Sequence, residues 1–310
     1  MINLIGNLNA ELILAQVKDR PDFGQEHLVD HLMFRPGGIA NMVYPLSRLG
    51  VKPRVIATLG KDQYGKQIYD DMKPLIEDGI MFTDRSTALS VGIVNQTGSR
   101  YFVTYSGDLY DFTKETVKRV KHFEQAKLSF YYGYFLLPNF TSEDALDCLK
   151  KSKELGQITM FDANSDINGW QPETRREIID LLPNIDYFMP NNEELLHLTG
   201  ESEIDKAAEI LLTHGARNIV VKQGENGAAL YSLNSKIHHT GFPTKAFDTT
   251  GAGDSFNAGF AYSLLQGADH REALAFGNAL ASIVVSRKEE RFPTVDEINV
   301  KLKAGSGMEA

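Results

Sequence analysis

Two hydrophobic periods alternate along most of the chain. Short apolar blocks, each of a length that suits a buried strand, occur at 2–5, 12–15, 53–59, 127–132, 157–162, 185–189, 217–222 and 227–232. Segments with apolar residues three and four positions apart predict helices at 39–49, 113–124, 142–155, 172–182, 192–199, 203–214, 255–266 and 272–285. This alternation predicts an α/β fold with a mostly parallel central sheet and helices on both faces. Ligands of such sheets bind at the carboxyl ends of the strands.

Two segments depart from this alternation. Residues 18–36 are polar and contain two prolines and a glycine, so we do not expect them in the core. Residues 88–94 and 100–105 are apolar runs on either side of Gln96-Thr97-Gly98-Ser99, which predicts a hairpin. We expect these segments to join into a small β-lid on a single domain. The predicted lid covers about 11–36 and 86–107, the domain 1–310, and a disordered tail 303–310.

Composition and charge narrow the function. The 310 residues are 42% hydrophobic and 24% charged, as in an ordinary globular protein. A net charge of -9 leaves no basic stripe for phosphates, so we expect no nucleic acid partner. No apolar run approaches the roughly 18 residues that cross a bilayer, and the start lacks the positive segment of a secretory signal. We therefore expect no membrane partner and a cytoplasmic location.

The single cysteine, Cys148, supports the same location. It has no partner in the chain for a disulfide, which fits a reducing compartment. We expect it to fill a helix face rather than to act as a nucleophile.

The stretch 247–260, FDTTGAGDSFNAGF, is a glycine-rich turn that leads directly into a helix. Gly251 and Gly253 remove side chains where the backbone approaches a ligand or turns sharply. A helix start offers unpaired N–H groups and roughly half a positive charge, which favours a phosphate. Asp254 at this start is suited to take a proton from a nucleophile that attacks the phosphate. The alternative is that Asp254 only caps the helix.

Polar residues also follow two of the predicted strands. Asp162-Ala163-Asn164 comes after the strand 157–161, and Asn191 and Glu194 come after 185–189. Carboxylates and amides at this edge suit hydrated Mg²⁺, which usually binds through one or two carboxylates and the substrate phosphates. The alternative is an ordinary helix start, with Asn191 as cap and Glu194 in the first turn.

These motifs together resemble the ribokinase-like (PfkB) carbohydrate kinase family. Residues 248–254, DTTGAGD, match the family's D-T-x-G-A-G-D signature. Residues 37–50, GGIANMVYPLSRLG, resemble its N-terminal signature and are followed by TLGKDQYG at 58–65, where we expect Asp62 to shape a loop. Asn191 and Glu194 match the family's N-x-x-E, and VKQGENGA at 221–228 resembles its nucleotide-binding segment.

The resemblance implies a role for each matching residue. Asp254 is the expected catalytic base, and the amides of Gly251, Ala252 and Gly253 form the expected anion hole. Expected substrate-binding residues are Asn9, Glu11, Gly37, Gly38 and Asn41. Expected nucleotide-binding residues are Asn164, Asn191, Lys222, Gly224, Gly227 and Asn278. Glu194 is expected to hold Mg²⁺ through water, and Asp248 and Thr250 are candidates for a monovalent cation such as K⁺. A lid-mediated homodimer also follows from the resemblance.

Three departures from the family pattern bear on specificity. Glu11 stands where the family commonly has Asp, which moves the carboxylate by roughly an ångström. Asp166 stands where fructokinase-like sequences often have Arg, which argues against an acidic sugar. Arg287-Lys288-Glu289-Glu290 replaces a common Gly-Ala beside the candidate cation site. Arg100 lies next to the predicted hairpin turn, and we expect a solvated residue there rather than a contact to an anionic substrate.

The function expected from these residues is ATP-dependent phosphorylation of a hydroxyl of a sugar or sugar-like substrate, with ATP and Mg²⁺ as cofactors. A nucleoside kinase of the same superfamily differs only in the acceptor and stays open. A non-catalytic sugar- or nucleotide-sensing module is less favoured, because base, anion hole and N-x-x-E are all present. A dinucleotide-dependent oxidoreductase is disfavoured, since GAGDSF is not GxGxxG and lies late in the chain.

Overall fold

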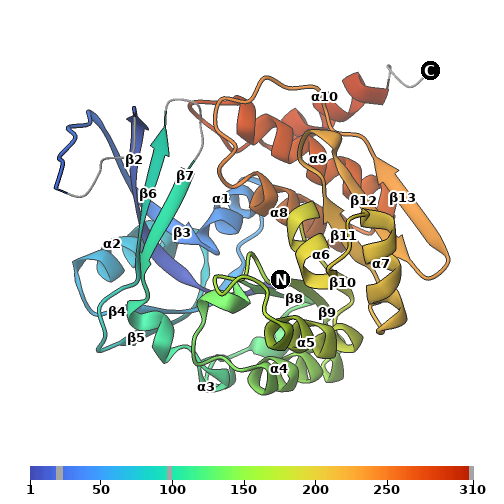
Figure 1. The fold of residues 1–310 in the computed structure, drawn as a ribbon, viewed down its shortest axis with the longest axis horizontal. Coiled ribbons are helices and arrows are strands. Elements are labelled where there is room, and N and C mark those ends of the chain that lie inside the picture. Colours follow the sequence, from blue (N-terminus) through green and yellow to red (C-terminus); the bar gives the residue numbers. More distant parts are fainter. Residues whose placement is uncertain (19–23, 96–99, 307–310) are drawn as a thin grey trace.

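The computed structural model describes residues 1–18, 24–95 and 100–306. Its central sheet has nine strands in the order β13-β12-β11-β10-β9-β8-β1-β4-β5 (Figure 1). The strands are β1 Ile2–Gly6, β4 Arg54–Gly60, β5 Glu77–Thr83, β8 Leu128–Tyr132, β9 Ile158–Asp162, β10 Tyr187–Phe188, β11 Ile219–Lys222, β12 Ala228–Ser232 and β13 Ser235–His239. All neighbours pair parallel except β11–β12 and β12–β13. The predicted mostly parallel sheet is confirmed.

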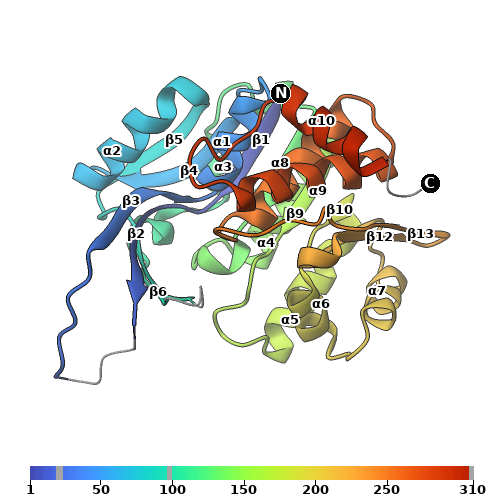
Figure 2. The same cartoon turned by 90° about the horizontal axis from the view of Figure 1, so that it is seen from above.

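Helices cover both faces of this sheet (Figure 2). They are α1 Ala40–Arg48, α2 Gln63–Met72, α3 Lys114–Lys118, α4 Ser142–Glu154, α5 Pro172–Leu181, α6 Asn192–Thr199, α7 Ile204–Thr213, α8 Ala252–Leu265, α9 His270–Ser286 and α10 Val295–Ser306. One buried cluster lies between the sheet and helices α1, α2, α8 and α9. The other lies between the opposite face of the sheet and helices α3, α4, α5, α6 and α7. Helix α10 packs on α9, where Ile298 meets Leu280 and Ile283.

The side-chain alternation of the strands explains why two cores form. In β8, Phe130 and Tyr132 point into the cluster under α1 and α8, whereas Tyr131 points into the cluster under α4. Successive strand residues face opposite sides of a sheet, so a strand buried on both faces is a continuous apolar run. That is the pattern from which the central strands were predicted.

A second sheet of four strands forms the lid, in the order β3-β2-β6-β7. Its strands are β2 Leu8–Val17, β3 His31–Gly38, β6 Leu89–Asn95 and β7 Arg100–Tyr105. The antiparallel pairing of β6 with β7 confirms the hairpin strands, and the predicted turn at 96–99 lies outside the described residues. Only Asn7 separates β1 from β2, so we infer one domain that carries the lid as an extension.

The structure corrects several sequence predictions. The segment 18–36 was expected outside the core as part of the lid, and its last residues do form the lid strand β3, where His31, Leu32 and Met33 are exposed. A lid strand buries few side chains, so it lacks the apolar run of a core strand. The predicted helix 113–124 is only α3, which ends at Lys118, and a short 3-10 turn; His122 between them has a left-handed φ of 62°, which a continuous helix does not contain.

Besides β3, four helices and strands of the described residues were missed. The strands β5 and β13 lie at the two edges of the central sheet and are only partly buried, so β13 (SKIHH) is mostly polar and β5 (EDGIMFT) has an apolar run of only three residues. Helix α2 buries only Gly65, Ile68 and Met72, too few residues for a clear period. Helix α10 extends to Ser306, so disorder from 303 is wrong up to that residue, and 307–310 lie outside the described part.

Candidate active site

The candidate site lies where three neighbouring strands end. In the sheet register Gly6 of β1 faces Tyr132 of β8, which in turn faces Asp162 of β9. A β-carbon at Gly6 would lie 2.2 Å from the carbonyl oxygen of Tyr132, so only glycine lets the strands meet here. Strand β1 lies between β8 and β4, and the strand order continues from it in opposite directions across the sheet. This makes the carboxyl end of β1 a topological switch point, a common place for ligands.

Asp254 lies in the first turn of α8, whose N-cap is Gly251 with a left-handed φ of 75°. Because Gly251 holds the capping position, the reading of Asp254 as a mere cap is wrong. Burial raises the pKa of Asp254 to about 6, and the nearby charge of Asp162 adds to the rise. Hydrogen bonds from the side chains of Tyr132 and Asn41 act in the opposite direction. The carboxylate thus faces groups from β8 and α1.

The glycine-rich turn 251–253 forms the start of α8, with Ala252 as its first helical residue. A β-carbon at Gly251 would lie 3.9 Å from Cγ of Asn41. One at Gly253 would lie 3.8 Å from Nζ of Lys222. The helix N-terminus and an ammonium group therefore lie side by side, which favours an anion at this place.

Lys222, at the end of β11, belongs to a buried polar cluster. Its Nζ lies 2.5 Å from Oδ2 of Asp162, and Nδ2 of Asn257 donates to the same oxygen at 2.7 Å. Burial lowers the pKa of Lys222, but the charges of Asp162 and Glu194 outweigh this and raise it above its ordinary value. The lysine is therefore held charged beside the start of α8.

Asn191 and Glu194 form a capping box at the start of α6. The backbone N–H of Asn191 donates to Oε2 of Glu194 at 2.8 Å, and the N–H of Glu194 donates to Oδ1 of Asn191 at 2.9 Å. The interpretation of these residues as an ordinary helix start is correct, yet it does not exclude a role of Glu194 in binding Mg²⁺. Glu194 also accepts a bond from Ser165 and feels the charges of Asp162 and Lys222.

This donor set fits Mg²⁺. Burial, and then the charge of Asp162, raise the pKa of Glu194 to about 7, which a nearby cation would reverse. Within the described residues no group of three His, Cys, Asp or Glu side chains encloses a metal site. A few oxygens near a phosphate position, rather than a closed cage, are what Mg²⁺ uses in sites for nucleotides.

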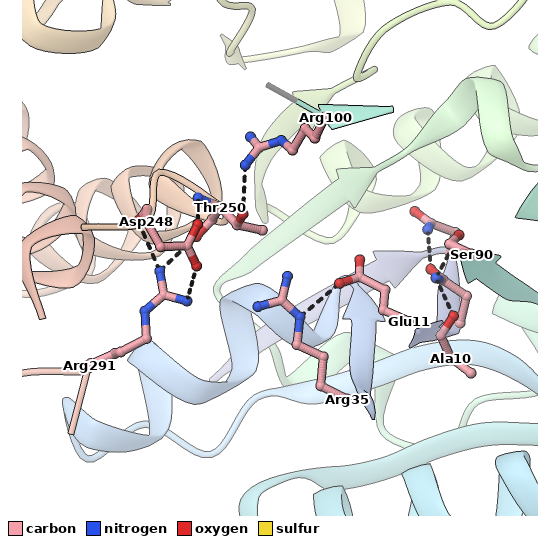
Figure 3. A network of polar contacts seen from close by, with 10 residues as sticks. Ala10, Glu11, Arg35, Ser90, Arg100, Asp248, Thr250 and Arg291 are labelled. Carbon is pink, nitrogen blue, oxygen red and sulfur yellow. Dashed lines mark hydrogen bonds and ion pairs between the residues drawn. The ribbon is translucent and has the colours of Figure 1, made fainter. Parts of the chain in front are cut away.

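Four of the five expected substrate residues come together where the lid joins the central sheet, and the fifth, Asn41, lies at the start of α1 beside Asp254. Asn9 and Glu11 of β2 pair with Gly37 and Arg35 of β3. Nδ2 of Asn9 donates to Oγ of Ser90 at 3.1 Å, and Nε of Arg35 donates to Oε2 of Glu11 at 2.8 Å (Figure 3). The glycine positions are required by close approach.

A β-carbon at Gly37 would lie 2.4 Å from Oε1 of Glu11, and one at Gly38 would lie 2.4 Å from the carbonyl oxygen of Asn7. Gly38 also has a left-handed φ of 61°. The neighbouring Oδ1 of Asn7 is buried and has no partner within the described residues. The joint thus presents polar atoms in a buried setting, as a sugar site does.

The remaining expected nucleotide residues lie around β12, β13 and α9. Gly224 is in the turn that leads from β11 to β12, and a β-carbon at Gly227 would lie 2.1 Å from the carbonyl oxygen of His239. Asn278 of α9 donates to that same carbonyl at 3.1 Å. Asn164, with a left-handed φ of 58°, lies instead beside Asp162, to whose carboxylate its backbone N–H donates at 3.1 Å.

Asp248 and Thr250 are engaged by an arginine that was not among the expected site residues. Nη1 of Arg291 donates to Oδ2 of Asp248 at 3.1 Å (Figure 3). Nη2 of Arg291 donates to the carbonyl oxygens of Asp248 and Thr250, at 3.3 and 2.9 Å. The oxygens that would have to bind a monovalent cation such as K⁺ therefore already accept hydrogen bonds from a guanidinium group. These residues do not fit the cation.

Arg100 was expected to be a solvated turn residue; it is exposed as expected, but it lies in a strand and makes a specific contact. It begins β7, and its Nη1 donates to Oγ1 of Thr250 at 2.6 Å, as Figure 3 shows. The side chain is exposed, yet it links the lid to the turn that precedes α8.

Three further residues have structural roles. The carboxylate of Asp166 accepts bonds from the backbone of Asn168 and Trp170 and from Oγ1 of Thr174, so it organises its own loop. Asp62 accepts bonds from Gly65 and Thr87 and shapes the loop as expected. Burial raises the pKa of Cys148 to about 12, which leaves a thiol without nucleophilic character.

Sequence reasoning therefore missed the side chains of Tyr132, Asn257 and Arg291, and gave Asp162 no role of its own. Asp162 was detectable as the carboxylate that ends a buried strand. Tyr132 lies within an apolar run and Asn257 within a helix, where nothing in the pattern separates them from their neighbours. Within the described residues, no helix combines the length and the apolar character needed to span a membrane.

Comparison with known proteins gives a consistent result. The profile described as pfkB family carbohydrate kinase matches residues 1–297. Probable fructokinase-5 of Arabidopsis thaliana is 30% identical over 272 residues, which cover 82% of this chain and 83% of the relative. The 5-dehydro-2-deoxygluconokinase of Clostridium botulinum (strain Eklund 17B / Type B) is 27% identical over 288 residues, with 86% and 83% covered.

Solved structures agree with the sequence relatives. Ribokinase from Thermotoga maritima superposes with a TM-score of 0.82 at 27% identity, over 97% of this chain and 99% of the other. A putative ribokinase II from E. coli in complex with ATP and Mg²⁺ gives a TM-score of 0.77 at 23% identity, over 98% and 99%. The central sheet with its small lid is thus the fold of ribokinases.

Proposed function

The chain belongs to the pfkB family of carbohydrate kinases, and on this premise we propose that Asp254 is the catalytic base of its phosphoryl transfer. The enzyme uses ATP to phosphorylate a sugar, the activity that its relatives share. The observation that supports Asp254 is its environment at the start of α8. Its pKa is raised to about 6, so near neutral pH the carboxylate is deprotonated and still a competent proton acceptor.

The neighbours of Asp254 divide the remaining work. Asn41 and Tyr132, which hydrogen-bond to the carboxylate, orient it toward the acceptor hydroxyl. The amides of Gly251, Ala252 and Gly253 face the charge that develops on the transferred phosphoryl group. Lys222 adds a fixed positive charge next to Gly253. Preorganised donors of this kind supply much of the rate enhancement of phosphoryl transfer.

The nucleotide lies, in this proposal, along the ends of β9 to β12. Asn164, Asn191, Gly224, Gly227 and Asn278 line that path. Gly227 must stay a glycine because a side chain would meet the backbone of β13. When bound with ATP, Mg²⁺ neutralises phosphate charge, and Glu194 would hold it through water. Burial and the charge of Asp162 raise the pKa of Glu194 to about 7, and the charge of Lys222 acts in the opposite direction.

The acceptor is proposed to be a free, uncharged sugar of the fructose type. Two sets of observations support this choice: the fructokinases among the relatives, and the charges at the lid joint. Arg35 is neutralised by Glu11, so it is not available to bind an acidic group. The polar atoms of Asn9, Glu11 and Asn41 suit hydroxyl groups. Asp166 does not bear on this choice, since its own loop uses it.

A substrate panel tests the proposal. ADP release with Mg-ATP would be measured for fructose, ribose, other free sugars, 5-dehydro-2-deoxygluconate and nucleosides, with Asp254→Asn as the catalytic control. We expect the highest kcat/KM for a free sugar. Preference for a nucleoside would make the enzyme a nucleoside kinase. If none of the acceptors in the panel supports ADP release, sugar phosphorylation is refuted.

The lid also offers a surface for a second copy of the chain. In the strand register Leu32, Val103 and Tyr105 share one face of the lid, and these residues are 64%, 64% and 58% exposed. Apolar patches of this kind commonly mark interfaces. We propose a homodimer through the lid, to be measured by sedimentation. We also propose a cytoplasmic location, where ATP is at hand, to be checked by cell fractionation.

A further inference from the structure

Arg291 lies in the loop between α9 and α10, and its guanidinium donates hydrogen bonds to the segment before α8 and to the last turn of α9. Nε donates to the carbonyl of Val284 at 3.4 Å, Nη1 to the carboxylate of Asp248, and Nη2 to the carbonyls of Asp248 and Thr250. A planar fork with several fixed donors holds such a set of acceptors in one arrangement. The arginine therefore ties two consecutive parts of the turn to the end of α9.

The two carbonyl oxygens that meet on Nη2 are the kind of ligand that a monovalent cation uses. A cation there would need oxygens that are free to turn toward it, and in this chain they already accept hydrogen bonds. The surrounding charge acts against a second cation as well, because Arg100 binds Thr250. Arg35 contributes further positive charge near Asp248. The position is thus occupied, electrostatically and sterically, by the side chain.

The Arg291 loop is itself fixed. Phe292 stacks on Tyr44 of α1 with ring centroids 5.7 Å apart, and Nε of Arg48 donates to the carbonyl of Phe292 at 3.2 Å. On the other side, Arg287 at the end of α9 forms an ion pair with Glu297 of α10 at 2.5 Å. A guanidinium on such a loop is held in place before any ligand binds.

The consequence lies one residue further along the chain. Thr250 is followed by Gly251, the N-cap of α8, and then by the amides of the proposed anion hole. The backbone N–H of Thr250 also donates to Oδ1 of Asp248 at 2.8 Å. The carboxylate of Asp248, which Arg291 binds, therefore fixes the backbone of Thr250 as well. The direction of the anion-hole amides thus depends on the guanidinium.

We propose that Arg291 serves as a built-in cation, which sets the turn before α8 and makes the kinase independent of K⁺. Arg291 is a positioning residue in this proposal, since it acts through the carbonyls of Asp248 and Thr250. The proposal rests on the kinase activity proposed above for one of its two readouts. The other readout is thermal and needs no substrate.

The first experiment uses the unmodified enzyme. Its melting temperature and its kcat with Mg-ATP and the best sugar would be measured in tetramethylammonium chloride and in KCl at equal ionic strength. We expect both to be the same in the two salts. Activation of about 10-fold or more by K⁺, or a melting temperature raised by about 5 °C, would overturn the proposal.

The second experiment creates the missing site. Arg291→Ala exposes the two carbonyls, and we expect kcat to fall by about 10²-fold, as for a misplaced catalytic group. K⁺ or guanidinium ion should then restore part of the loss, and K⁺ should raise the melting temperature of this variant only. Arg291→Lys, which keeps a charge but has a different geometry, should lie between the two.

Arg48→Ala is the matched control, because it removes a contact of the same loop without touching Asp248 or Thr250. We expect it to keep wild-type kcat and no response to K⁺. If Arg291→Ala keeps wild-type kcat, or loses activity that neither K⁺ nor guanidinium restores, the positioning role is wrong. If no acceptor is phosphorylated at all, the kinase proposal fails, whereas the melting temperatures still decide on the cation.

Discussion

Nζ of Lys222 lies 2.5 Å from Oδ2 of Asp162, at the floor of the candidate site. The Asp162 side chain is 1% exposed and that of Lys222 is 13% exposed. Burying two charges costs desolvation free energy, which their mutual attraction offsets. Removing one of them leaves the other buried without a partner. The pair also fixes the direction of the lysine, whose ammonium lies beside Gly253. The side chain that forms this structural ion pair is also the one that we propose as a phosphate contact.

The first prediction concerns this lysine. Lys222→Met keeps the length of the side chain but leaves Asp162 without its partner. We expect the KM for ATP to rise and the free energy of unfolding to fall by about 3 kcal/mol, as for a broken buried pair. Denaturant unfolding and ATP titrations measure the two effects. In the double variant with Asp162→Asn the stability should partly recover while the KM stays high, and a recovery of both would refute the phosphate contact.

The second prediction concerns the proposed base. Asp254→Asn should lower kcat by about 10²- to 10⁴-fold, the usual contribution of a general base, and leave the KM for ATP close to that of the wild type. Near-wild-type turnover would reject the assignment.

The same substitution also has a thermodynamic signature. The pKa of Asp254 is raised from 3.8 to about 6, so the folded state disfavours the carboxylate. This cost is fully present above pH 6 and disappears as the pH falls below about 4. We therefore expect Asp254→Asn to melt at a higher temperature than the wild type near pH 7.5, with the difference shrinking on acidification. Melting curves across pH 4 to 8 measure it.

The third prediction is the pH profile. If deprotonated Asp254 is the active form, kcat/KM falls as the pH drops through about 6. Tyr132 donates a hydrogen bond that lowers this pKa, so Tyr132→Phe should move the acid limb to higher pH. A change that only disturbed the fold would lower the plateau without moving the limb. An unchanged limb in Tyr132→Phe would show that Asp254 does not control it.

The fourth prediction concerns the link between the lid and the turn before α8. Arg100→Ala removes the bond to Oγ1 of Thr250, and Thr250→Val removes it from the other side. A single hydrogen bond of this kind contributes about 1 kcal/mol, so each variant should raise the KM for the sugar by about 5-fold. The double variant should be no worse than either one. Additive losses in the double-mutant cycle would show that the two side chains act separately.

The sequence predicted the parts of this molecule whose local pattern differs from their surroundings. The central strands are apolar because both faces are buried, and DTTGAGD has glycines where the backbone of α8 begins. Asp254, Asn191 and Glu194 follow from their places at helix starts. The lid strand β3 was missed because much of it is exposed, and helix α2 because three buried residues give no period.

Contacts between distant segments were out of reach for the same physical reason. Arg291 is one of several charged residues in RKEER, and 43 positions separate it from Asp248. No periodicity distinguishes the arginine that turns inward from those that stay in solvent. The use of Asp166 by its own loop was hidden as well, since a carboxylate in a loop looks the same in sequence whether it binds backbone or substrate.

The joint between the two sheets has a mechanical consequence. The chain crosses from the central sheet to the lid at Asn7 and returns at Ile39, and the N–H of Ile39 donates to the carbonyl of Asn7 at 2.9 Å. The lid strands β2 and β3 are thus tied to each other where they leave the central sheet, next to Asn9 and Gly38. If the sugar binds at Asn9 and Gly38 as proposed, it contacts this joint directly, so we expect the bound sugar to influence the position of the lid strands that start there.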